Sequence, residues 1–237
     1  MTFFAVIPAA GKSLRMGSEH KLLLEWPRSD SKAKVLSDGS ILTDSCGRWT
    51  VLHNVLNAWK KSQVDRICIV LRSADRKLAR IAEQFGVDVA TVANDVPQMK
   101  DSICAGLRYL EQSYAPQNCD FCLVSPADIP MLQPVVIDRV IAGAFEAESP
   151  VVPCYRAEHC GEVALLEPGK RGHPIAMPWN LMRQTHGLKE DQGLNVLLDR
   201  YADSTVWVDL PLSLKPTDID TPEEYQQLLD RQREQNS

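Results

Sequence analysis

Residues 3–21 of the chain read FFAVIPAAGKSLRMGSEHK, an apolar run that ends in a turn of small residues and cations. The run over residues 3–7 is typical of a strand buried on both faces, as strands are in a parallel sheet. In an open α/β sheet, ligands bind beyond the carboxyl ends of the strands, which is where residues 9–11 follow. The stretch therefore predicts an α/β fold with a ligand site on its first loop.

The turn after this strand has the composition of a phosphate site. Residues 9–11 carry little or no side chain, so their backbone N–H groups can approach a ligand closely. Lys12, Arg15 and Lys21 place three cations around the same turn, which suits a polyphosphate. A glycine- and serine-rich turn with surface cations is the alternative.

Two better-known phosphate loops do not fit. The P-loop pattern G-x-x-x-x-G-K-[ST] needs a glycine where this chain has Val6, and G-x-G-x-x-G fails because the turn holds only Gly11 and Gly17. Residues 9–21 do resemble the A-A-G-x-S-x-R-M-G-x-x-K signature of the nucleotidyltransferases, with one extra residue before Lys21. The molybdenum-cofactor nucleotidyltransferases are the most similar group.

Composition is that of an ordinary globular protein. The 237 residues are 44% hydrophobic and 24% charged, enough for one α/β domain with a sizeable core. A net charge of −5 gives no basic footprint for nucleic acid or an anionic membrane. We find neither an apolar run long enough to span a bilayer nor a signal-peptide pattern, so we expect a cytoplasmic protein.

Strand and helix patterns alternate along the chain. Strands are expected at residues 67–71, 87–92, 121–124 and 206–208, and helices at 51–59, 74–85, 102–114, from 133 and from 222. Asp101 is expected to cap the helix over 102–114. This alternation predicts a single doubly wound, mostly parallel sheet with helices on both faces, over 1–237. The resemblance implies the Rossmann-like nucleotidyltransferase fold.

The polar segment at about 27–46 is an insertion relative to the family pattern. Two short β-prone runs flank Asp38-Gly39, which predicts a hairpin. It lies on the loop side of the sheet, where it is suited to a lid or a homodimer contact, and a surface hairpin without a role explains it equally well.

Seven cysteines in a chain without secretory signals indicate reduced thiols. Cys119 and Cys122 form a C-x-x-C, but no second pair with zinc spacing follows. We interpret them as two small strand residues whose sulfurs diverge. Cys154 and Cys160 are open to a ligand or redox role.

An apolar strand at residues 121–124 runs into a single carboxylate, Asp128, between two prolines. The family carries D-x-P here, and the resemblance implies that Asp128 binds Mg²⁺ beside the nucleotide phosphates. Mg²⁺ takes one or two carboxylates and otherwise phosphate and water oxygens. An Asp that only shapes the loop is the alternative.

Residues 218–225 read DIDTPEEY and resemble the family's D-I-D-T-P-E-D-L. Thr221 with Glu224 forms a capping box and Pro222 stands at the first helical position, so a helix begins here. The resemblance implies that Asp220 is the second metal carboxylate. An Asp that merely favours a helix N-terminus would explain one acid but not the whole pattern.

Two further resemblances concern the acceptor. Gly172-His173-Pro174 resembles the G-H-P motif of the molybdenum-cofactor members, which implies an acceptor contact at His173. Asp191 stands in a segment similar to their G-D-x-G-A-R loop, although Leu194 and Asn195 replace Ala-Arg. These differences leave the acceptor open.

Together, these patterns imply transfer of a nucleotidyl group from an NTP to a small phosphate-bearing acceptor such as molybdopterin, with release of pyrophosphate. The Ala-Ala-Gly start resembles the cytidylyl members, which favours CTP. We expect Arg15 to hold the leaving β,γ-phosphates, Lys21 the α-phosphate, and Asp128 and Asp220 the Mg²⁺. The expected nucleotide-binding residues are Ala9, Ala10, Gly11, Lys12, Ser13, Arg15 and Lys21.

Two other functions remain open. A sugar- or polyol-phosphate nucleotidyltransferase would share the N-terminal signature but has no need of the G-H-P motif. A nucleotide-binding sensor or accessory domain without turnover would not need Arg15, Lys21, Asp128 and Asp220 together.

Overall fold

The computed structural model describes residues 1–11, 20–27, 48–94, 98–156 and 171–235. The strands are β1 (Phe3–Pro8), β2 (Arg66–Arg72), β3 (Asp88–Val92), β4 (Phe121–Val124), β5 (Val151–Arg156), β6 (Ile175–Pro178) and β7 (Val206–Pro211). The helices are α1 (Val51–Lys60), α2 (Arg76–Gln84), α3 (Met99–Tyr114), α4 (Pro134–Ala144), α5 (Trp179–Met182), α6 (Leu194–Arg200) and α7 (Pro222–Gln235). Short 3-10 turns are η2 (Lys21–Leu23), η3 (Arg183–Gly187), η4 (Ala202–Ser204) and η5 (Leu212–Leu214).

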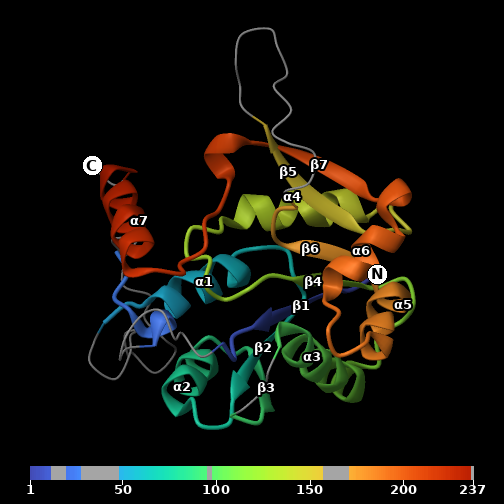
Figure 1. The fold of residues 1–237 in the computed structure, drawn as a ribbon, viewed down its shortest axis with the longest axis horizontal. Coiled ribbons are helices and arrows are strands. Elements are labelled where there is room, and N and C mark those ends of the chain that lie inside the picture. Colours follow the sequence, from blue (N-terminus) through green and yellow to red (C-terminus); the bar gives the residue numbers. More distant parts are fainter. Residues whose placement is uncertain (12–19, 28–47, 95–97, 157–170, 236–237) are drawn as a thin grey trace, which may run out of the picture.

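The described strands form one seven-stranded sheet in the order β3-β2-β1-β4-β6-β5-β7, with helices on both faces (Figure 1). β1 pairs in parallel with β2 and β4, and β2 pairs in parallel with β3. Among the strands that the structure describes, only β6 runs the other way, antiparallel to both β4 and β5. The predicted fold class, a mostly parallel sheet covered on both sides, is confirmed. The hairpin predicted around Asp38-Gly39 lies outside the described residues.

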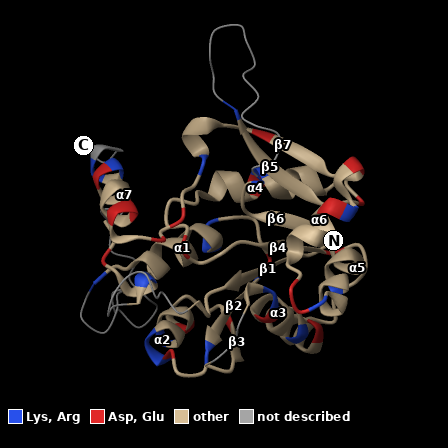
Figure 2. Cartoon of the chain, in the orientation of Figure 1, with Lys and Arg blue, Asp and Glu red and all other residues tan. Residues whose placement is uncertain are grey.

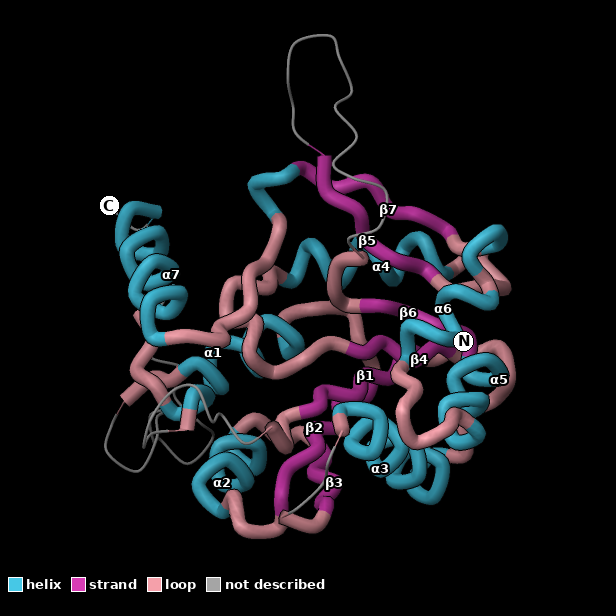
Figure 3. The backbone as a smooth tube through the Cα atoms, viewed as in Figure 1, coloured by secondary structure: helices cyan, strands magenta, loops and turns pink. Residues whose placement is uncertain are grey.

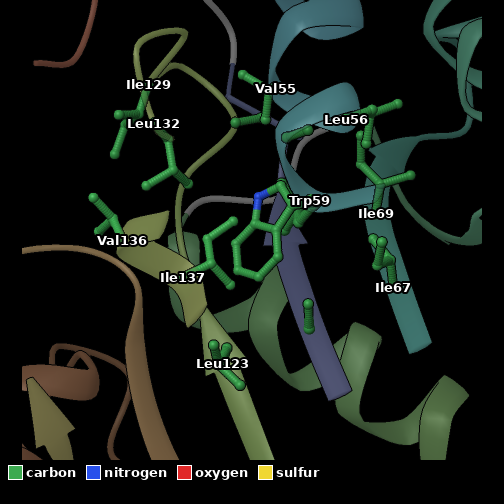
Figure 4. Close-up of a cluster of buried hydrophobic side chains, with 14 of the residues drawn as sticks. Val55, Leu56, Trp59, Ile67, Ile69, Leu123, Ile129, Leu132, Val136 and Ile137 are labelled. Atoms are coloured by element: carbon green, nitrogen blue, oxygen red, sulfur yellow. The ribbon is translucent and has the colours of Figure 1, made fainter. Parts of the chain in front are cut away.

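Alternate side chains of β1 enter two separate cores, as expected for a strand buried on both faces. Phe3, Ala5 and Ile7 join the cluster covered by α1, α2 and α4, while Phe4 and Val6 join the cluster under α3, α5 and α6. Figure 4 shows part of the first core. Trp59, with none of its surface exposed, is surrounded there by aliphatic side chains from the sheet and α4. Both cores hold β1 fixed, and with it the loop that follows.

Helix α3 approaches the sheet closely because Gly106 faces β1 and β2. A Cβ atom at this position would lie 2.7 Å from Val6 Cγ1 and 3.0 Å from Val70 Cγ2. The same helix begins earlier than predicted: Gln98 precedes its first residue, and the Asp101 N–H already donates to the Gln98 carbonyl. The predicted cap at Asp101 was therefore wrong, and this acid instead lies in the first turn, where the helix dipole favours it.

The C-x-x-C cysteines do not share a strand, contrary to our interpretation. Cys119 lies exposed in the turn before β4, and Cys122 is buried within β4. Burial raises the pKa of the Cys122 thiol. Both are free thiols, as is Cys154, and Cys160 lies outside the described residues.

Residues of both charge signs occur together on α3 and on α7 (Figure 2). Within the part of the chain that the structure describes, no helix combines the length and apolar character that crossing a membrane requires.

The N-terminus of α7 is fixed by the predicted capping box. Glu224 Oε2 accepts hydrogen bonds from the backbone N–H groups of Asp220 and Thr221, at 2.9 and 2.8 Å, and Thr221 Oγ1 accepts from the Glu224 N–H at 3.2 Å. The Tyr225 hydroxyl donates to the Glu25 carbonyl, which ties α7 to the segment after η2. The backbone around Asp220 is therefore held from two directions.

We expect Glu224→Ala to lower the free energy of unfolding by about 1 kcal/mol, because it leaves two backbone N–H groups at the start of α7 without their acceptor. Urea denaturation measures this loss. Glu223→Ala is the matched control, since Glu223 lies exposed in the same first turn. An equal loss in both variants would contradict the specific role of Glu224.

Candidate active site

A cavity of about 410 Å³ opens at the carboxyl ends of β1 and β4. This is the edge of the sheet where the sequence predicts the ligand. The cavity is lined by Pro8, Ala9, Ala10, Gly11, His20, Lys21, Leu22, Gln98, Met99, Ser102, Pro126, Ala127 and Asp128. The loops after two neighbouring strands and the first turn of α3 thus form its walls.

The small residues after β1 are held in place by the strands beside them. The Ala9 N–H donates to the Val70 carbonyl at 2.9 Å, and the Ala127 N–H donates to the Pro8 carbonyl at 3.2 Å. Ala9 and Ala10 are buried, whereas Gly11 is exposed and a Cβ built on it would meet no atom within 4 Å. Four of the predicted nucleotide-binding residues line the cavity: Ala9, Ala10, Gly11 and Lys21. Lys12, Ser13 and Arg15 lie outside the described residues.

Lys21 reaches the cavity from η2, a turn that is anchored on both sides. The His20 ring caps it, with Nδ1 accepting from the Leu22 N–H at 3.3 Å, and Leu22 is buried in the core. Just beyond, the Val51 N–H donates to the Leu24 carbonyl at 2.9 Å. Burial also lowers the pKa of His20. The backbone of Lys21 is therefore fixed, while its four-carbon side chain extends into the site.

The Lys21 ammonium lies between the two predicted metal carboxylates. Its Nζ is 2.5 Å from Asp128 Oδ2 and 3.5 Å from Asp220 Oδ1, and it also donates to the Ile219 carbonyl at 3.0 Å. The side chains of Lys21 and Asp128 are 15% and 19% exposed, so water screens this pair only in part. The structure thus places three residues that are far apart in the sequence in one cluster of charges.

Ile219 brings the two carboxylates together. Its side chain has none of its surface exposed, and its backbone N–H donates to the Asp128 carbonyl at 2.9 Å. Through this bond the loop between β7 and α7 lies against the loop after β4 (Figure 3). Asp128 and Asp220 therefore reach one site from two loops that lie far apart in the sequence.

These carboxylates fit a divalent cation. Asp128 Oδ1 is buried and has no hydrogen-bond partner among the described residues, so one carboxylate oxygen has unused capacity. An unpaired buried oxygen is costly unless a ligand takes it up. Over the same residues no three His, Cys, Asp or Glu side chains group as a ready metal site. Two carboxylates are what Mg²⁺ needs when phosphate and water complete its shell.

His173 lies near this cluster. Burial lowers the pKa of His173, against the opposing effects of backbone hydrogen bonding at Val124 and of the Asp128 and Asp218 charges. Its Nδ1 is buried without a hydrogen-bond partner in the described part of the chain. The preceding Gly172 is required by packing, because a Cβ there would lie 2.5 Å from the Tyr155 ring. The G-H-P segment is thus held tightly against β5.

Asp191 does not line the cavity. It lies exposed in the loop before α6, and this loop is fastened to α3 by the buried Lys100, whose Nζ donates to the Lys189 carbonyl at 2.6 Å. The first turn of α3 forms one cavity wall, so the Asp191 loop is coupled to that wall rather than part of it. Sequence reasoning singled out neither Lys100 nor the cavity residue Ser102.

Comparison with known proteins places the chain in a family. The sequence profile of the MobA-like NTP transferase domain matches residues 5–205. No curated protein matches the chain. Among solved structures, the Mycobacterium tuberculosis Rv0371c homologue from Mycobacterium sp. strain JC1 has a TM-score of 0.71 at 20% identity, covering 98% of this chain and 97% of that one.

The descriptions of two other solved structures name a bound ligand. Rv0371c from Mycobacterium tuberculosis H37Rv, in complex with manganese, has a TM-score of 0.66 at 20% identity and covers 97% of this chain and 98% of its own. The CMP:2-keto-3-deoxy-manno-octonic acid synthetase complexed with CTP has a TM-score of 0.68 at 12% identity, covering 99% and 100%. At these identities the likeness shows the fold. The family itself rests on the profile match over most of the chain: this protein belongs to the MobA-like NTP transferase domain family and is a nucleotidyltransferase.

Proposed function

We propose that this enzyme transfers an NMP group from an NTP, with CTP favoured, to a small phosphate-bearing acceptor and releases pyrophosphate. The observation that carries the proposal is the Lys21 ammonium between Asp128 and Asp220, at the edge of a cavity walled by small residues. Phosphoryl chemistry depends mainly on positioning and on neutralising charge. No protein nucleophile is needed.

In this proposal the loop after β1 holds the nucleotide. Ala9 and Ala10 present little side chain to the cavity, and the space beside Gly11 is open, so a phosphate or ribose can approach the backbone closely. Arg15 would neutralise the leaving β,γ-phosphates, and Lys12 and Ser13 would add contacts to the same group. These three roles follow from the sequence signature.

Asp128 and Asp220 would hold a divalent cation, for which we propose Mg²⁺. The unpaired Oδ1 of Asp128 supports this role, and a fold relative solved with manganese is consistent with a divalent ion. When bound, the ion would offset phosphate charge and orient the α-phosphate for in-line attack. Lys21 would then donate to the α-phosphate oxygens as negative charge shifts during transfer.

For the acceptor we propose molybdopterin or a similar phosphate-bearing compound. His173 would contact it, since this residue lies near Asp128 and has a buried ring nitrogen with no described partner. Asp191 would act from the loop that Lys100 fastens to α3. Preference for CTP rests on the Ala-Ala-Gly start, and a fold relative solved with CTP is consistent with it.

We expect Asp128→Asn and Asp220→Asn each to abolish Mg²⁺-dependent pyrophosphate release, because the amide has lost the charge that holds the ion. The assay combines each of the four NTPs with molybdopterin and with sugar and polyol phosphates. Thermal denaturation should show little loss of stability in either variant. Asp203→Asn, an equal charge change at an exposed residue of η4, is the control and should keep full activity.

Retained turnover in Asp128→Asn or Asp220→Asn would remove that residue from the proposed metal site. No pyrophosphate release by the unaltered enzyme with any NTP and acceptor would instead favour a binding domain without turnover.

We expect Arg15→Ala to lower turnover by about ten- to hundredfold, the scale of one lost hydrogen bond to a charged group. Stability should change little. Arg108→Ala, which removes an exposed arginine from α3, is the control. Steady-state kinetics with the best NTP and acceptor provide the measurement, and unchanged NTP affinity and turnover in Arg15→Ala would contradict the phosphate-loop assignment.

A further inference from the structure

We propose that Lys21 competes with the divalent cation for Asp128 and Asp220, and that its ammonium holds these carboxylates until nucleotide phosphates draw it away. The inference rests on the proposed function, because it assigns Lys21 two successive sets of partners at the same site. It makes Lys21 a residue that sets the order of ligand binding as well as a phosphate contact.

All three donors of the Lys21 ammonium have acceptors in this structure. A lysine ammonium has three N–H donors, and the Lys21 ammonium has three acceptors within 3.5 Å: Asp128 Oδ2, the Ile219 carbonyl and Asp220 Oδ1. In this arrangement no donor is left for a phosphate oxygen. Lys21 therefore has to give up carboxylate contacts before it can bind the α-phosphate.

The charges of the cluster also favour exchange of Lys21 for the ion over binding of both. Asp128 and Asp220 together carry two negative charges, and Lys21 supplies one positive charge to both. A divalent ion and the Lys21 ammonium are both positively charged, so they repel each other at the same carboxylates. A divalent ion and the Lys21 ammonium therefore do not share the pair in this arrangement.

Within this cluster, the Lys21 side chain is the partner that can move. The Ile219 N–H bond to the Asp128 carbonyl joins the backbone beside Asp220 to that of Asp128. The Asp220 backbone is also held by its N–H bond to the Glu224 carboxylate. The backbone of Lys21 is fixed by η2, but its four-carbon side chain is flexible. Rotation of this side chain alone moves the ammonium, so the exchange needs no rearrangement of the fold.

The binding order follows. Without nucleotide, the ion must displace Lys21 and binds weakly. With nucleotide, the phosphates provide Lys21 with new acceptors and the same carboxylates become available to the ion. Because coupling between two ligands is reciprocal, the ion also strengthens nucleotide binding.

The test measures Mn²⁺ binding to the nucleotide-free enzyme by electron paramagnetic resonance of the unbound ion. We expect Lys21→Met, which keeps the length of the stem without the charge, to bind Mn²⁺ at least about tenfold more tightly than the unaltered protein. Lys21→Arg keeps the charge and should bind Mn²⁺ as weakly as the unaltered protein. Lys21→Gln is a second neutral variant in case Lys21→Met does not fold.

Two controls test whether the gain in Mn²⁺ affinity arises at Asp128 and Asp220. Lys60→Met removes the same charge near the amino ends of β2 and β3, at the far edge of the sheet, and should leave Mn²⁺ binding unchanged. Lys21→Met combined with Asp128→Asn should lose the gain in affinity. Unchanged or weaker binding in the neutral Lys21 variants would overturn the proposal, as would a gain that survives Asp128→Asn.

The Mn²⁺ experiment distinguishes failure of the competition from failure of the proposed function. Pyrophosphate release by the unaltered enzyme, together with no tightening in Lys21→Met, would leave nucleotidyl transfer intact and reject the competition. Tightening in Lys21→Met without pyrophosphate release from any NTP would support the competition and reject the proposed reaction.

Discussion

The backbone hydrogen bond from Ile219 to Asp128 joins the two parts of the chain on which the site depends. Asp128 follows the central strand β4, whereas Ile219 belongs to the loop before the last helix. With the Ile219 side chain fully buried, this loop is anchored to the sheet. Asp220, the next residue, then lies within reach of the same ammonium as Asp128. Without this bond, the second carboxylate would have no fixed relation to the first.

The sheet supplies the other half of the site. Because β1 is buried on both faces, packing in the two cores fixes its carboxyl end. The Ala9 N–H bond to the Val70 carbonyl fixes the loop that follows. Gly106 allows α3 to pack directly on β1 and β2, which brings the start of α3 to the cavity wall. Small residues therefore have two roles here. Gly106 allows close helix packing, and residues 9–11 leave space at the cavity.

Local patterns in the sequence predicted the elements whose causes are local. The apolar run of β1 and the capping box of Thr221 and Glu224 are confirmed, because periodicity and capping depend on neighbouring residues. The antiparallel direction of β6 was not predicted, since strand direction depends on pairing with β4, far away in the sequence. The start of α3 was missed because Gln98 makes no side-chain capping bond and so leaves no local signal.

In the candidate site too, local features could be predicted and long-range contacts could not. Its residue types and loop positions could be predicted for Lys21, Asp128 and Asp220, because each follows a recognisable strand or precedes a recognisable helix. Their mutual contacts could not, because Lys21 was expected at a phosphate and the structure places it on the carboxylates. Lys100 was missed because its partner is a backbone carbonyl, which no side-chain pattern reveals.

The central claim is that the divalent ion and Lys21 compete for one pair of carboxylates, and that the nucleotide draws Lys21 away from it. A crystal structure of the enzyme with CTP and Mn²⁺, with the ion located by its anomalous scattering, tests it most directly. The account predicts Mn²⁺ bound by both Asp128 and Asp220, with the Lys21 ammonium moved from Asp128 to the α-phosphate. Mn²⁺ bound elsewhere, with Lys21 still between the two carboxylates and the nucleotide in the cavity, would contradict it.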